Sequence, residues 1–151
     1  MGSEHTIVGT LLVEYAEPLG ANIKRMLLHA PQSFVDQALG VVAEAVRETA
    51  LAGEPVAEQT VLRRLETRGT LTTAGGALAL ARLAGYAVSN ELAELDAQEL
   101  WQRYKATRTQ SVLSDGAEAI GEFPNRAELI ADGVTRTLAE LNRDTEARTL
   151  T

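Results

Sequence analysis

The sequence contains no cysteine and very few aromatic residues. Without cysteine there are no disulfide bonds, zinc–thiolate sites or thiol catalysis, and a cytoplasmic location is expected. Aromatic residues make up only 4% of the chain, whereas hydrophobic residues make up 45%. A buried core must therefore be built from Leu, Val, Ile and Ala. Because Ala and Leu dominate and β-branched runs are scarce, the composition favours helices.

The chain also lacks an excess of positive charge, since its formal net charge is -7. An acidic chain does not attract phosphate backbones, so we expect no direct binding of nucleic acid. No segment approaches the roughly 18 consecutive apolar residues of a membrane span. The start, MGSEHTIVGTLL, lacks the basic region of a signal peptide. We therefore expect no association with a membrane.

Motifs that are typical of enzymes are missing as well. Neither GxxxxGK[ST] nor GxGxxG occurs. The two histidines, His5 and His29, have no partners at metal-site spacing, and no Ser or Thr has a histidine at a suggestive distance. Gly75-Gly76 ahead of a helix either surrounds an anion or, as we favour, forms a tight helix entry. We expect no catalytic residue, no cofactor and no metal.

Apolar periodicity predicts an all-α fold that begins with a small head of orthogonal helices at residues 1–89. The first helix starts near Glu4 and is broken by Pro18 and Gly20. Ser33 is the expected N-cap of the third helix. The other helices of the head are expected at 22–29, 34–52, 59–68 and 75–86.

The head is followed by a predicted long antiparallel αα-hairpin at residues 90–143. Asn90 is the expected cap of its first helix, at 91–119, and the second helix is expected at 126–143. An apolar stripe on the second helix recurs at spacings of four, four and three: Ile130, Val134, Leu138 and Leu141. Three apolar side chains of the first helix are expected across the seam: Leu95, Trp101 and Tyr104.

A lone hairpin cannot cover its own apolar surface. Its second face either pairs with another copy of the chain or folds back on the head. We therefore expect self-association, as a dimer or a larger ring, through the hairpin. The polar end, residues 144–151, is expected to begin a linker in a longer protein.

An acidic run opens the first helix of the hairpin: Glu91, Glu94, Asp96 and Glu99. Leu92 and Leu95 lie among these acids. One interpretation is a docking surface for a basic, partly apolar partner. The other is a solvated helix start, where negative charge is favourable.

The order of these motifs resembles the N-terminal domain of DnaB-type replicative helicases. EHTIVGTLL is similar to the opening motif of that family, and Gly53-Glu54-Pro55-Val56 is similar to its G-x-P-[VI] turn. The remaining likeness is carried by Phe34, Val41, Val42, Ala45, Val61, Leu65, Gly69, Leu71, Gly75, Gly76, Leu80, Leu83 and Asn90. Three positions depart from the family pattern, because Leu39, Ala57 and Ala79 replace its usual histidine, aspartate and tyrosine.

The resemblance implies a non-catalytic domain that forms a collar on a hexameric ring. In that family, hairpins pair between subunits, the collar docks primase or loader proteins, and the ATPase motor lies C-terminal. The alternative is a free-standing helical adaptor or regulator that shares the fold. An enzyme or ligand-binding bundle is a third class, and it would need a buried polar pocket.

Overall fold

The computed structural model describes residues 2–143, and it is built of helices with no strand among these residues. The all-α prediction is confirmed. The helices are α1 (Ser3–Val13), α2 (Ala21–Leu28), α3 (Gln37–Leu51), α4 (Glu58–Arg68), α5 (Gly76–Leu83), η1 (Ala84–Tyr86), α6 (Asn90–Glu122), η2 (Pro124–Arg126) and α7 (Ala127–Leu141). The expected linker at 144–151 lies outside the described residues.

The described residues divide into two compact units within α6. The head unit comprises residues 2–101, and the hairpin unit comprises residues 102–143. The expected boundary between residues 89 and 90 coincides with the start of α6 rather than with this division. The first turns of α6 therefore belong to the head unit.

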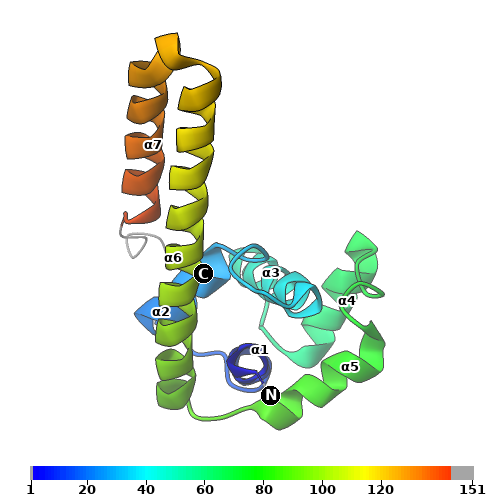
Figure 1. Cartoon of the computed structure of the whole chain (residues 1–151). Coiled ribbons are helices and arrows are strands. Elements are labelled where there is room, and N and C mark those ends of the chain that lie inside the picture. The colour runs from blue at the N-terminus through cyan, green and yellow to red at the C-terminus, as the bar shows by residue number, and fades with distance from the viewer. Residues whose placement is uncertain (1, 144–151) are drawn as a thin grey trace. The chain divides into compact units, whose positions relative to one another are not determined.

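Helix α1 lies at the centre of the head unit, where it packs against α3, α5 and η1 (Figure 1). Its apolar residues are packed by aliphatic side chains of the surrounding helices, as the scarcity of aromatics requires. The largest fully buried side chains are Ile7, Val8, Leu11, Ile23, Met26, Leu27, Val42, Val46, Val61, Leu65 and Leu80. All of them belong to the head unit.

Gly9 allows α1 to approach the end of α5 closely. A Cβ atom at Gly9 would lie 2.2 Å from the Leu83 carbonyl oxygen. The next residue, Thr10, completes this contact through its hydroxyl, which accepts a hydrogen bond from the Val88 N–H at 3.0 Å and donates one to the Val88 carbonyl at 3.3 Å. These hydrogen bonds satisfy backbone groups that would otherwise be unpaired between η1 and α6.

Two predicted helix caps are wrong. The N-cap of α3 is Asp36, whose Oδ1 accepts a hydrogen bond from the Leu39 N–H at 3.2 Å. Ser33 instead donates its hydroxyl hydrogen to the Met26 carbonyl at 2.6 Å, and it is buried. Ser89 accepts from the Leu92 N–H, so the cap of α6 lies one residue before Asn90. A short polar side chain does cap the start of both helices, as expected. In each case, however, a polar residue other than the predicted one is the N-cap.

In the hairpin unit, the second half of α6 runs antiparallel to α7 (Figure 1). Gly116 is buried in the seam between them, where a Cβ atom would lie 2.6 Å from Cγ2 of Val134. Val112, one turn earlier on α6, is also buried. A small residue at this position lets the two helix backbones approach closely.

Candidate functional site

The residues predicted for self-association are distributed over both units. Tyr104 and the α7 stripe lie in the hairpin unit, and all of them are partly exposed. That stripe comprises Ile130, Val134, Leu138 and Leu141. Leu95 and Trp101 lie in the head unit. Trp101 is only 5% exposed and packs against His29, with ring centroids 4.9 Å apart, whereas Leu95 is 60% exposed.

The acidic run of α6 separates into side chains with different surroundings. Glu94 accepts hydrogen bonds from the backbone N–H groups of Asn22 and Ile23, at 3.0 to 3.1 Å. It also accepts from the Asn22 side-chain amide at 2.8 Å. These N–H groups are unpaired donors in the first turn of α2. Glu94 therefore stabilises the start of a helix that lies 72 residues earlier in the sequence.

Asp96 is also engaged within the head unit, because its Oδ2 accepts a hydrogen bond from the Thr6 hydroxyl at 2.7 Å. Glu91 and Glu99 are exposed. The apolar neighbours Leu92 and Leu95 are exposed as well, by 55% and 60%. Glu94 and Asp96 thus hold positions within the head unit, and Glu91 and Glu99 are exposed in the same helix as the exposed pair Leu92 and Leu95.

Glu4 has a structural role that the sequence reasoning did not assign. Its side chain is buried, and its carboxylate accepts hydrogen bonds from the N–H groups of Val35 and Asp36, at 2.7 and 3.0 Å. A carboxylate that is satisfied by backbone donors can be buried at low cost. The signal in the sequence was only a glutamate in the first turn of α1, three residues before its first large apolar residue, Ile7.

Arg47 of α3 performs the corresponding role at the end of α2. One guanidinium nitrogen donates to the carbonyl oxygens of Leu27, Leu28 and Ala30, at distances of 2.8 to 3.2 Å. These carbonyls include unpaired acceptors of the last helical turn. Helix α2 is therefore held at both ends by charged side chains from other helices.

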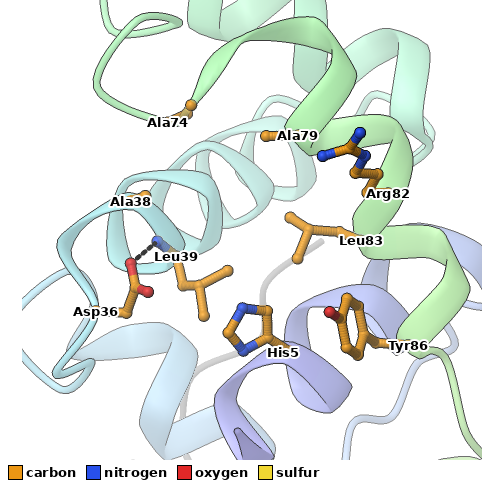
Figure 2. Close-up of a pocket in the computed structure, with 10 residues that line it drawn as sticks. His5, Asp36, Ala38, Leu39, Ala74, Ala79, Arg82, Leu83 and Tyr86 are labelled. Atoms are coloured by element: carbon orange, nitrogen blue, oxygen red, sulfur yellow. Dashed lines mark hydrogen bonds between the residues drawn. The ribbon is translucent and has the colours of Figure 1, made fainter. Parts of the chain in front are cut away.

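A pocket of about 250 Å³ opens in the head unit between α1, α3 and α5 (Figure 2). Apolar side chains line it together with four polar ones: His5, Asp36, Arg82 and Tyr86. The ring of His5 packs against that of Tyr86, with centroids 4.9 Å apart. Sequence patterns did not predict this pocket, because its lining residues come from three separate segments of the chain.

Among residues 2–143, no group of three or more His, Cys, Asp or Glu side chains is arranged to hold a metal ion. No helix in this part of the chain combines the length and apolar character that crossing a membrane requires.

The family model of the DnaB-like helicase N-terminal domain matches residues 1–102. The chain belongs to this family. The match ends at the division between the two units, so the head unit carries the sequence signature of DnaB-like helicases. The domain that this family describes is a non-catalytic part of these helicases.

The fold is similar to that in the crystal structure of the N-terminal domain of DnaB helicase from Mycobacterium tuberculosis. The TM-score is 0.57 at 23% sequence identity, and the similarity covers 87% of this chain and 94% of that one. Coverage of this extent takes in residues of the hairpin unit beyond the family match. No curated protein matches the sequence.

Proposed function

We propose that the chain is a non-catalytic oligomerisation and docking domain of a replicative DNA helicase, and that copies associate through the hairpin unit. The observation that carries this proposal is the incomplete burial of α7. None of its residues is fully buried, including the predicted stripe Ile130, Val134, Leu138 and Leu141. Three more large apolar side chains of the hairpin unit are at least half exposed: Leu113, Phe123 and Leu129.

Apolar surface of this extent favours association with a second copy. Fully burying one Leu or Ile side chain stabilises by roughly 1.5–3 kcal/mol, so completing the burial of several such side chains gives a substantial driving force. The same surface on another hairpin is available by symmetry, as a two-fold dimer requires. The family membership supports this partner over an unrelated one.

The test is the molar mass of the chain in solution, measured by light scattering across a range of concentrations. Leu138→Asp should shift the population toward monomer. Ala139→Asp, which places the same charge on the exposed neighbouring position, should leave the mass unchanged. Circular dichroism of both variants separates dissociation from unfolding. A wild-type chain that stays monomeric at high concentration would contradict the proposal.

The start of α6 supports docking of a protein partner. Leu92 and Leu95 lie one turn apart and are exposed, and the exposed acids Glu91 and Glu99 flank them. We propose that a basic, partly apolar surface binds here, and that it belongs to the helicase-binding part of primase or to a helicase loader. Charge complementarity at such a site chiefly raises the association rate.

This docking proposal is tested by the double change Glu91→Lys and Glu99→Lys. Association of the cognate primase, measured at two salt concentrations, should become slower and less dependent on salt. The matched control reverses Glu118 and Glu128, two exposed acids of the hairpin unit. Equal kinetics for both double variants would remove the docking role from the α6 start. Glu94 is left intact because it stabilises α2.

A further inference from the structure

The pocket of the head unit contains polar groups that the fold itself does not use. Arg82 is exposed and forms no ion pair or hydrogen bond with the described residues. The hydroxyl of Tyr86 likewise forms no hydrogen bond with them. Both side chains come from the α5–η1 segment and border the same cavity (Figure 2). A guanidinium and a phenol hydroxyl are donors, and together they suit a carboxylate oxygen pair.

An acceptor lies on the opposite wall. Asp36 uses Oδ1 to cap α3, whereas Oδ2 has no hydrogen-bond partner among residues 2–143. Figure 2 shows Asp36 and Arg82 on opposite sides of the cavity. The pocket therefore presents a cation and a donor at one end and a carboxylate at the other.

Apart from His5, whose buried Nδ1 has no hydrogen-bond partner in the described part of the chain, the surface between these ends is apolar. Leu39 and Leu83 are buried beneath the cavity, and Ala38, Ala74 and Ala79 complete its lining. At about 250 Å³ the cavity is smaller than the roughly 300–1,000 Å³ of drug-sized sites. It suits one amino-acid residue rather than an extended ligand.

We propose that this pocket binds the carboxy-terminal residue of a partner peptide when that residue is aliphatic. The terminal carboxylate lies against Arg82 and Tyr86, and the residue's amide N–H donates to Asp36. The aliphatic side chain covers Leu39 and Leu83. An inorganic phosphate suits the pocket less, because the Asp36 carboxylate repels a doubly charged anion more strongly than a carboxylate. The apolar side chains of the lining would also leave phosphate oxygens beside them without hydrogen bonds.

A second pocket of the head unit is also lined by arginines, but two of these arginines are paired with glutamates. It is lined by Arg63, Arg64 and Arg68 of α4 and holds about 160 Å³. Arg64 pairs with Glu54 at 2.6 Å, and Arg68 pairs with Glu48. Its charge is thus largely neutralised by the fold, in contrast to that of Arg82.

The test uses N-acetyl-leucine as the probe and backbone amide NMR of the whole chain as the readout. This compound carries the carboxylate, the amide N–H and the aliphatic side chain of a terminal residue. It should shift the resonances of Leu39, Leu83 and Tyr86. N-acetyl-leucinamide, which lacks the charge, should bind at least about tenfold more weakly, as the loss of a charged hydrogen bond predicts.

Arg82→Gln should weaken N-acetyl-leucine binding by about tenfold or more, and Tyr86→Phe by less. Arg63→Gln is the matched control, because it removes an exposed arginine outside this pocket and should leave binding unchanged. The proposal fails if the acid and the amide bind equally, or if the shifts map elsewhere. It also fails if inorganic phosphate shifts the same resonances at equal or lower concentration.

Discussion

The head unit and the hairpin unit bury their apolar residues to very different degrees. The head unit holds all the largest fully buried side chains, whereas in residues 102–143 only Val112 and Gly116 are buried. Side-chain hydrogen bonds also join distant segments of the head, as between Thr6 and Asp96. The contrast shows that the head unit has a core of its own, whereas the hairpin unit leaves much of its apolar surface exposed.

The largest effect on stability is expected from a substitution that disrupts the core of the head unit. Gly9→Ala should reduce the free energy of unfolding by about 3 kcal/mol or more, because the new Cβ atom collides with the rigid Leu83 carbonyl. Urea unfolding followed by circular dichroism measures the change. Gly85→Ala is the control, since a Cβ atom there has no neighbour within 4 Å. Equal stability of the two variants would refute the close approach of α1 and α5.

A smaller loss is expected from removing one long-range cap. Glu94→Ala should reduce the free energy of unfolding by about 1–2 kcal/mol, because the first N–H groups of α2 lose their acceptor. Gln98→Ala, an exposed change one turn later on α6, should have an effect within about 0.5 kcal/mol. If hydrogen exchange of the α2 amides is unaltered by Glu94→Ala, the cap has no energetic role.

The hairpin should respond to changes that leave the head intact. Gly116→Ala should destabilise the hairpin unit by about 1 kcal/mol, because the added methyl group pushes against Val134. Gly133→Ala lies on α7 with open space around its Cβ position, so it should stabilise the same helix by about 0.5–1 kcal/mol. Hydrogen exchange of α7 amides distinguishes the two. We expect protection of the α7 amides to fall in Gly116→Ala and to rise in Gly133→Ala, with the head amides unchanged in both. A change of the same sign in the two variants would contradict the close approach of α6 and α7 at Gly116.

The smallest expected effect concerns pH. Burial, and secondly the Arg47 guanidinium, lower the pKa of His29 below its ordinary value of 6.5. The unfolded chain therefore binds a proton more readily than the folded head does. The stability that depends on neutral His29 is fully present above about pH 6.5 and is lost as the pH falls through the lowered pKa. His29→Gln should flatten this slope in denaturant midpoints measured from pH 7.5 to 5, and an unchanged slope would refute the assignment.

Local patterns predicted a helix at each of α1 to α7, although α3 begins at Gln37 rather than at residue 34. The period of Ile130, Val134 and Leu138 identified the apolar face of α7, and Gly69 ends α4 in the left-handed conformation that glycine favours. The family resemblance rested on such local motifs and is confirmed. The roles of the stripe in self-association and of the α6 acids in docking stay predictions.

Contacts between distant residues could not be read from the same patterns. Glu91 and Glu94 look equivalent in the sequence, but only the position of Glu94 meets the start of α2. Leu92 and Leu95 fit an apolar spacing and are nevertheless exposed. Which side of a helix meets the core depends on its neighbours in three dimensions, and so does the convergence of residues on the pocket.

The capping of α2 has a consequence for the order of folding. An eight-residue helix is far below the length of about 12–15 residues at which isolated helices become even marginal in water. Its two end caps come from Glu94 and Arg47, up to 72 and 20 residues away. Closing those loops precedes any gain from the caps, so we expect α2 to become ordered after α3 and the start of α6 have come together. In the kinetics of the head, substitutions in α2 should chiefly accelerate unfolding and leave the folding rate almost unaltered.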